Sequence, residues 1–313
     1  MNYPFRLGRM AIRCPRCGHR EFKPFVDAAG RILDPTCGRC NRELKCGYFL
    51  PPSRLPHRPR QAAAPAATIL PPPHYIDPAM VQQSMQRTDA TDPLARWFGR
   101  HFGADTARWV FDAYRVGVSR LYGGSPVFWL TDGWQRTRSG KIMAYGPDAR
   151  RRRTEGRPAV TYVHSLLPDA TGYNYRSCLF GAHLRSANRH ASVLLVESEK
   201  TALYLACCLH RRGMLLRRYI PMATGGCACT CTTEALRDPH HRFHELAGAP
   251  LVMLPDADAT DKWAERREGF ARVCASVRLI DLRTLARTPT DDIMDIILRR
   301  HTPPPLSITE KTS

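Results

Sequence analysis

The C-terminal third of the chain alternates short apolar runs with amphipathic segments. The runs SVLLVE, RRYIPMATGG, PLVMLPDAD and SVRLIDL are separated by stretches with helical spacing, such as KTALYLACCLHRR and DKWAERREGFARVCA. Continuous Val, Leu and Ile runs between helices are typical of βαβ units, in which helices cover both faces of a parallel sheet. The pattern therefore predicts an α/β domain built on a parallel sheet over residues 191–300.

The middle of the chain has a mixed pattern. DPLARWFGRHF and DTARWVFDAYRVG carry apolar residues at helical spacing, with Asp92 and Asp105 placed to cap the two helices. SPVFWLTD, SGKIMAYGP and AVTYVHS follow and are typical of strands interrupted by Gly, Asp and Pro turns. We therefore expect an α+β subdomain over residues 91–190.

The two ends of the chain and the segment at residues 51–90 have little apolar patterning. Residues 1–50 are rich in Cys and Gly, which favours a small domain held by metal. Residues 51–90 begin with a tract of Pro, Ala and Arg and are expected to be an extended linker. Residues 301–313 are expected to be a disordered polar tail.

The net charge of the chain indicates what kind of partner it binds. The 313 residues include 47 Lys and Arg against 28 Asp and Glu, a formal net charge of +19. Such an excess attracts polyanions and predicts contact with nucleic acid. No stretch approaches the roughly 18 consecutive apolar residues of a membrane helix, and the N-terminus has no apolar signal region. We therefore expect a cytoplasmic protein without membrane contact, whose 12 cysteines are metal ligands or buried thiols.

Five cysteines near the N-terminus have the spacing of a metal site. Cys14 and Cys17 form one C-x-x-C pair, Cys37 and Cys40 form another, and Cys46 follows. Four thiolates in a tetrahedron are the usual ligands of structural zinc, so we predict a zinc ribbon. Spacing alone favours the two C-x-x-C pairs; the alternative pairs Cys40 with Cys46 and leaves Cys37 outside.

Acidic residues follow two of the expected parallel strands. Glu197 ends SVLLVE, and Asp256 and Asp258 end PLVMLPDAD. Ligands of open α/β sheets gather at the carboxyl ends of the strands, and clustered carboxylates there suit Mg²⁺ or Mn²⁺. Gly225 and Gly226 end the strand between them and would let the backbone approach a phosphate. The sequence thus predicts a metal site fit for phosphoryl chemistry.

The order of these motifs resembles the Toprim domain of DnaG-type primases, topoisomerases and some nucleases. The motif E-G-x-E-T-A of plasmid and phage primases corresponds to E-S-E-K-T-A at residues 197–202. The family's motif D-x-D-x-x-G corresponds to D-A-D-A-T-D at residues 256–261. Ser198 and Asp261 replace glycines of that pattern. Zinc-binding segment, mixed basic region and Toprim-like region follow one another in the primase order. The likeness covers nearly the whole chain except the linker and the tail.

This resemblance implies a fold and a zinc set. The fold is a Toprim core with a Rossmann-like parallel sheet, a mixed α+β N-terminal subdomain and a small zinc ribbon. The nearest likeness is to a bacterial family, often carried on mobile elements, that shares GRCNRELKCGY, SGKIMAY, VESEKTA and PDADATDKW. That family favours Cys14, Cys17, Cys40 and Cys46 as the zinc ligands, with Cys37 spare.

The resemblance also assigns catalytic roles. Glu197, Asp256 and Asp258 would hold Mg²⁺ or Mn²⁺ while a 3′-hydroxyl attacks the α-phosphate of a nucleotide, and Glu197 has the alternative role of general base. Lys200, in the helix that follows, would meet the same phosphate; the alternative is a surface lysine paired with Glu197.

Basic residues of the central region are the candidates for binding the nucleotide. Lys141, with Arg136 and Arg138 nearby, is expected to contact the triphosphate, together with the backbone at Gly225 and Gly226. The alternative for these basic side chains is solvated turn charges.

The expected function is that of a DNA primase-like nucleotidyltransferase of plasmid or mobile-element replication. Its partners would be a single-stranded DNA template, NTPs or dNTPs, and a replicative helicase or initiator. The first alternative is a Toprim fold that binds nucleic acid without catalysis, because two glycines of the pattern are replaced. A Toprim nuclease is a weaker alternative, because it needs neither a zinc ribbon nor a primase-like central region.

Overall fold

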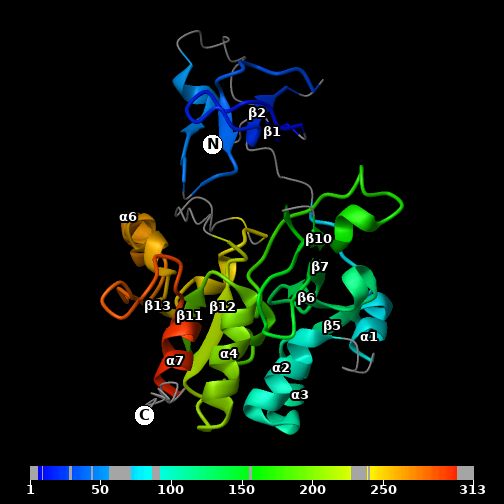
Figure 1. Cartoon of the computed structure of the whole chain (residues 1–313), viewed down its shortest axis with the longest axis vertical. Helices are drawn as coiled ribbons and strands as arrows, with labels where there is room; N and C mark the ends of the chain where they lie inside the picture. The colour runs from blue at the N-terminus through cyan, green and yellow to red at the C-terminus, as the bar shows by residue number, and fades with distance from the viewer. Residues whose placement is uncertain are drawn as a thin grey trace, which may run out of the picture. The chain divides into compact units, whose positions relative to one another are not determined.

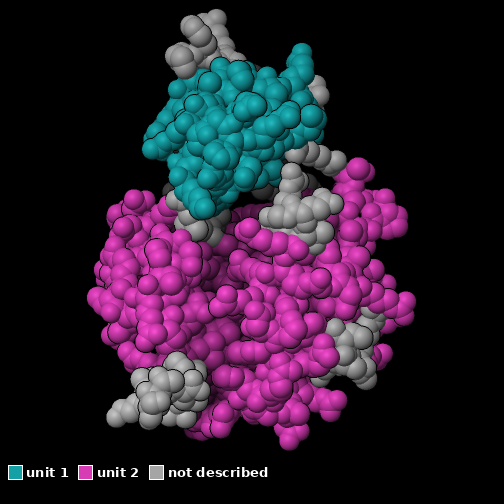
Figure 2. Space-filling view, viewed as in Figure 1, with its two compact units in different colours: residues 1–70 teal, residues 71–313 magenta. Residues whose placement is uncertain are grey.

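The computed structural model divides the chain into two compact units, residues 1–70 and residues 71–313 (Figure 2). The structure describes residues 6–8, 10–27, 30–43, 45–55, 72–86, 92–154, 157–226, 238 and 240–301. Within these ranges, no helix combines the length and the apolar character needed to cross a membrane. The expected tail beyond residue 301 and most of the Pro- and Ala-rich tract lie outside the described residues.

Residues 1–70 form a small antiparallel sheet with almost no apolar core. Its strands follow one another in chain order, β1 (Arg6–Leu7), β2 (Phe22–Val26), β3 (Gly38–Cys40) and β4 (Phe49–Leu50), and the turn η1 (Pro52–Arg54) follows. Phe22 is fully buried and packs beside the thiols of Cys14 and Cys40. A Cβ atom at Gly38 would overlap the Lys23 carbonyl, so glycine lets β3 approach β2. Little else is buried here, as expected of a metal-held domain.

Residues 71–313 begin with helices packed on a four-stranded antiparallel sheet of order β10-β7-β6-β5 (Figure 1). The helices are α1 (Pro78–Met85), α2 (Pro93–Phe102) and α3 (Ala104–Ala113). The sheet strands are β5 (Val116–Ser119), β6 (Ser125–Thr131), β7 (Thr137–Met143) and β10 (Val160–Tyr162). A separate short ribbon joins β8 (Arg153–Thr154) to β9 (Arg157–Pro158), and the turns η3 (Leu121–Gly123), η4 (Val163–Leu166) and η5 (Ala182–Leu184) complete the region. The expected α+β character is confirmed.

The parallel sheet expected from the apolar runs is present, with order β12-β11-β13-β14 and parallel pairing throughout. Its strands are β11 (Ser192–Val196), β12 (Tyr219–Ala223), β13 (Pro250–Met253) and β14 (Ser276–Leu279). The helices are α4 (Glu199–His210), α6 (Thr260–Ala271) and α7 (Ile293–His301), with the short turns η6 (His244–Leu246) and η7 (Ala257–Ala259). The α/β class is therefore confirmed.

Both faces of this parallel sheet are covered. Along β11, Leu194 and Val196 pack in the cluster that contains α4 and α7, whereas Val193 and Leu195 pack in the cluster that contains Trp263 of α6. Side chains alternate between the faces of a strand, so one run of four apolar residues, VLLV, packs into two layers. This double burial explains why the run is continuous and does not alternate with polar residues.

One core joins the antiparallel and parallel regions of this unit. Tyr114, Phe128 and Phe180 belong to the same buried cluster as the apolar face of α4. The Tyr114 hydroxyl donates to the Pro221 carbonyl at 2.9 Å, which ties the end of α3 to β12. The side chains of the two sheets are therefore held at fixed distances from one another.

The segment expected to be a linker differs from the prediction at its end. Residues 72–86 are described, and Ile76 just before helix α1 and Val81 within it pack on the antiparallel sheet. The Trp129 indole donates to the Ser84 hydroxyl at 2.9 Å. Asp77 caps this helix by accepting from the Ala79 amide, and the proline that follows Asp77 stands at its first position. Its start signals are hidden in the sequence by the neighbouring Pro-rich tract.

Candidate metal and nucleotide sites

Four cysteines of residues 1–70 converge on one point. The sulfur atoms of Cys14, Cys17, Cys40 and Cys46 all lie within 4.8 Å of one another. The Cys14 and Cys46 sulfurs are 3.7 Å apart, and those of Cys17 and Cys40 are 3.9 Å apart. The His19 amide donates to the Cys17 sulfur and lowers the pKa of this thiol to about 6, which favours the thiolate. Four sulfur atoms this close together are a tetrahedral zinc ligand set.

Cys37 lies outside this group. Its buried thiol donates to the Leu50 carbonyl of β4 at 3.3 Å, and burial raises its pKa. Of the two ligand sets left open by the spacing, the structure assembles the one with Cys40 and Cys46. The residues therefore fit a zinc ion held by the four converging thiolates.

The carboxylates of the second motif lie at adjacent strand ends. Glu197 follows β11, and Asp256 and Asp258 follow β13, which pairs with β11 in parallel at Leu195 and Met253. The Glu197 side chain is buried and accepts from the Asp256 amide. Its Oε1 atom has no hydrogen-bond partner. A buried carboxylate oxygen without a donor is costly unless a cation approaches it.

Electrostatics at this edge also calls for a cation. Burial and then the Asp258 carboxylate raise the pKa of Glu197 to about 7. Burial, then Glu197 and then Asp292 raise the pKa of Asp256 to about 8, and Arg151 only partly opposes both shifts. The three predicted carboxylates are therefore close enough to repel one another. Among the described residues, only the cysteine group has all its ligand atoms within 4.8 Å, so the carboxylate oxygens are more widely spread.

A third acidic segment borders this site, and the residue-by-residue predictions missed it. Asp292 accepts from the Asp295 amide at 3.0 Å and from the Thr201 hydroxyl of α4. The Ala257 amide donates to the Asp291 carbonyl at 3.0 Å and ties this segment to the D-x-D loop. The available signal was the sequence DDIMD at residues 291–295, which spans the start of α7. We name Glu197, Asp256, Asp258, Asp292 and Asp295 the acidic edge.

Lys141 reaches a second position between the two sheets. Its Nζ donates to both carboxylate oxygens of Glu199, at 2.9 and 3.1 Å, and to the Gly225 carbonyl at 3.3 Å. The Lys141 and Glu199 side chains are only 7% and 1% exposed. Two predicted nucleotide contacts, Lys141 and Gly225, thus lie together. Glu199 was missed, although it stands in the E-S-E wording beside Glu197.

Arg136 and Arg138 serve a different cluster. The Arg138 guanidinium is buried and donates to the carboxylate of Asp132 and to the carbonyl of His240, at 3.2 and 2.6 Å. Arg136 pairs with the same aspartate and lies over the Tyr75 ring, 4.5 Å from its centroid. Both guanidinium groups are held by contacts of the fold, and the structure does not bring them to Lys141.

Lys200 lies beside the acidic edge but is not paired with Glu197. Its Nζ donates to the Ala149 carbonyl at 3.3 Å. Burial lowers its pKa, and the carboxylates of Asp292 and Asp295 oppose that shift. The surface-lysine alternative therefore does not describe this side chain, because its ammonium group is largely covered.

Ser198 and Asp261 replace glycines of the Toprim pattern, and both stand where the backbone does not need glycine. Ser198 has φ of −105° and caps α4, its hydroxyl accepting from the Thr201 amide at 3.1 Å. Asp261 stands in the first turn of α6 and pairs with Arg283 at 2.9 Å. Neither backbone requires the left-handed conformation that favours glycine. The backbone at both positions is therefore unstrained.

Two family models match the chain. A zinc beta-ribbon finger family matches residues 2–60, and a family described as "Domain of unknown function (DUF6371)" matches residues 92–257. No curated protein matches the sequence.

Solved structures similar to the chain include primase catalytic cores. The primase fragment of the bacteriophage T7 primase-helicase protein is 16% identical with a TM-score of 0.37, over 62% of this chain and 66% of that one. The E. coli primase catalytic core is 15% identical with a TM-score of 0.41, over 71% of this chain and 73% of that one. A DnaG primase catalytic domain bound to single-stranded DNA has a TM-score of 0.40 with the same identity and coverage. Because these TM-scores are below 0.5, the assignments below depend on the geometry of this chain.

Proposed function

We propose that this chain, which belongs to the family described as a domain of unknown function (DUF6371), is a primase-like protein that binds single-stranded DNA and transfers nucleotides at its acidic edge. One observation carries this proposal. The buried Oε1 of Glu197 has no donor and lies at the carboxyl edge of the parallel sheet, beside an aspartate whose pKa is raised to about 8. Both features are relieved by a divalent cation.

The residues of the acidic edge fit a magnesium or manganese ion. Glu197, Asp256 and Asp258 offer only carboxylate oxygens, which both ions prefer. Bound there, such an ion neutralises charge on the phosphates of a nucleotide. Glu197 would orient the site from its buried position, whereas Asp258 is exposed and can meet an incoming substrate. Lys200 would hold Asp292 and Asp295 in place through its positive charge.

The nucleotide would reach this edge past Gly225 and Gly226. These glycines have φ of 73° and 154° and follow β12, the strand beside β11. Their lack of Cβ atoms leaves the backbone open to a phosphate. Lys141 lies against Gly225 and adds a positive charge, part of which Glu199 neutralises. Lys141 is therefore assigned a positioning role as well as a contact with the triphosphate.

The template would be held by charge. The chain has a formal net charge of +19, and contacts to the phosphate backbone depend strongly on such an excess. The zinc ribbon is assigned a template contact on the same ground. The resemblance to plasmid and phage primases supports a role in mobile-element replication with a helicase or initiator as partner.

A non-catalytic nucleic-acid-binding protein is the second candidate. The observation that favours it is the spread of the carboxylate oxygens, which do not all lie within 4.8 Å of one another as the four sulfurs do. In this case the chain would bind DNA through its positive charge alone, and the acidic edge would not catalyse nucleotide transfer.

Primer synthesis separates the two candidates. The zinc-loaded full chain is incubated with single-stranded DNA, labelled NTPs or dNTPs, and Mg²⁺ or Mn²⁺. Beside it are the variant Asp256→Ala/Asp258→Ala and a control with the same change in charge, Asp169→Ala/Glu265→Ala, at exposed positions away from the edge. Short products from the wild type and the control, and none from the first variant, are expected.

Two results would contradict this function. Equal product from both variants would place catalysis elsewhere. No product from any protein, together with salt-dependent DNA binding by all three, would leave the binding protein as the better description.

A further inference from the structure

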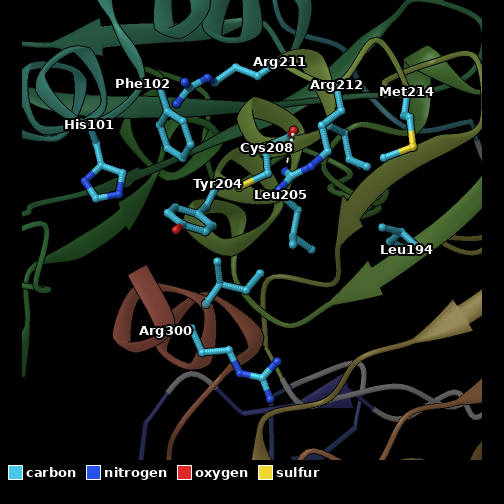
Figure 3. A pocket seen from close by; sticks show the side chains of 12 residues that line it. His101, Phe102, Leu194, Tyr204, Leu205, Cys208, Arg211, Arg212, Met214 and Arg300 are labelled. Carbon is cyan, nitrogen blue, oxygen red and sulfur yellow. Dashed lines mark hydrogen bonds between the residues drawn. The ribbon is translucent and has the colours of Figure 1, made fainter. Parts of the chain in front are cut away.

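One cavity lies at the opposite end of α4 from the acidic edge. It has a volume of about 840 Å³ and is bounded by α4, the end of α2, β11 and α7 (Figure 3). Leu205, Cys208 and Leu209 face it from α4, three and four residues apart as one helix face requires. At 1.5 Å per residue, Cys208 lies about 14 Å along the helix from Glu199. The cavity is therefore a separate site.

Its wall is mostly apolar. Phe102, Leu194, Tyr204, Met214 and Ile297 line it together with the α4 residues, and His101 adds an imidazole. The ring of Tyr204 packs edge-on to Phe102 with centroids 5.1 Å apart. A volume of this size accommodates several apolar side chains of a bound segment. Leaving such a wall open to water forgoes the hydrophobic stabilisation that a bound segment would supply.

Its rim is positive. Arg211 and Arg212 come from the C-terminal end of α4, and Arg300 comes from α7 on the other side of the cavity (Figure 3). All three are exposed, and the Arg212 guanidinium donates to the Cys208 carbonyl at 3.1 Å. Among the described residues, no Asp or Glu lines the cavity and no carboxylate pairs with these three arginines. The rim therefore offers three cations that an occupant could neutralise.

We propose that this cavity docks an acidic amphipathic helical segment of a partner protein. Apolar side chains of that segment, spaced i, i+3, i+4 and i+7, would fill the space between α4 and α7, and carboxylates beside them would meet the rim arginines. An uncharged apolar occupant would leave the rim unsatisfied, and nucleic acid would place phosphates against an apolar wall. Charge complementarity thus selects an acidic peptide over both.

The test uses a fluorescein-labelled synthetic peptide of about 14 residues, with Leu at i, i+3, i+4 and i+7 and Glu elsewhere. Binding to the zinc-loaded full chain is followed by anisotropy. The rim variant is Arg211→Glu/Arg212→Glu/Arg300→Glu. The control is Arg96→Glu/Arg120→Glu/Arg267→Glu, which changes the net charge equally at exposed positions elsewhere. Melting temperatures establish that both variants are folded.

The rim variant is expected to weaken binding at least about tenfold, and the control less than about threefold. A peptide of the same composition with scrambled Leu positions should also bind at least about tenfold more weakly. Saturating peptide should slow alkylation of Cys208, mapped by mass spectrometry.

Four results would overturn the proposal. One is the absence of binding to the wild type. Another is an equal loss in both variants, which would mean attraction to the overall charge. The third is unchanged alkylation of Cys208 at saturation, which would place the peptide elsewhere. A dimer of the wild type that the rim variant dissociates would make a second copy of this chain the occupant and would also overturn it.

Discussion

Replacing Lys141 by Met tests the buried ion pair that joins strand β7 to the start of helix α4. The substitution removes the ammonium group that contacts both Glu199 oxygens at 2.9 and 3.1 Å, while Glu199 stays 1% exposed. Breaking a buried pair in this way costs about 3–5 kcal/mol, because the remaining charge is buried without a partner. At about 1.4 kcal/mol per factor of ten, the unfolding equilibrium shifts by about two to three and a half orders of magnitude.

Urea denaturation followed by tryptophan fluorescence measures this loss. All five tryptophans lie in residues 71–313, so the signal reports the unit that holds the pair. The double variant Lys141→Met/Glu199→Gln removes both charges and should recover all but about 1–2 kcal/mol. A loss below about 1 kcal/mol in the single variant, or no recovery in the double variant, would refute the argument that the pair is buried and coupled.

Three further predictions concern other parts of the molecule. By elemental analysis, Cys37→Ser should keep one zinc per chain and Cys40→Ser should lose it. The reason is that, of these two cysteines, only Cys40 lies with the other thiols. Equal zinc content in both variants would contradict the ligand set. Burial lowers the pKa of His183 to about 4, so the folded state resists a proton that the unfolded chain takes up near pH 6.5. The contribution of His183 should therefore lower the free energy of unfolding by about 3 kcal/mol as the pH falls from 6.5 to 4. In urea denaturation, the variant His183→Gln should not show this loss. Gly225→Ala would place a Cβ atom 3.0 Å from Glu199 Oε1 in a backbone with φ of 73°. In the same assay, this variant should lose about 1–3 kcal/mol of unfolding free energy. An unchanged denaturation midpoint would show that Gly225 does not approach Glu199 tightly.

The parallel sheet and its acidic edge could be predicted because their signal is local. The apolar runs of β11, β12 and β13 are largely buried on both faces, which makes these runs continuous. The residues that follow each run must lie at the carboxyl edge of the sheet. Glu197 and Asp256 were found in this way. The start of α1 was hidden, because its Asp–Pro signal follows a Pro-rich tract that dominates the composition.

Spacing alone could not choose between Cys37 and Cys40 as a zinc ligand, because the choice depends on the position of strand β3. Cys40 ends β3 and Cys37 immediately precedes it. Side chains alternate along a strand, so two residues three apart point to opposite faces. A C-x-x-C pair binds one ion when it stands on a turn, as Cys14 and Cys17 do, and the second pair stands on a strand instead.

Contacts between distant segments could not be read from local patterns. Lys141 and Glu199 are 58 positions apart, the lysine in strand β7 and the glutamate at the start of helix α4. Arg138 lies where the β6–β7 register shifts, Leu130 pairing with Ser139 and Thr131 with Thr137. Such an irregularity redirects a side chain. Arg138, expected to lie near the triphosphate or to be a solvated turn charge, instead makes buried contacts within the fold.

The divalent-cation site of the acidic edge is tested most directly by Mn²⁺ binding to the zinc-loaded chain, measured from the paramagnetic resonance of free Mn²⁺. The pKa values of Glu197 and Asp256 are raised to about 7 and 8, so protons compete with the metal below those values. Affinity should rise at least about tenfold from near pH 6 to near pH 8.5, and Glu197→Gln should abolish most of it at the higher pH. Equal affinity at both pH values and in the variant would contradict the assignment of this edge as the metal site.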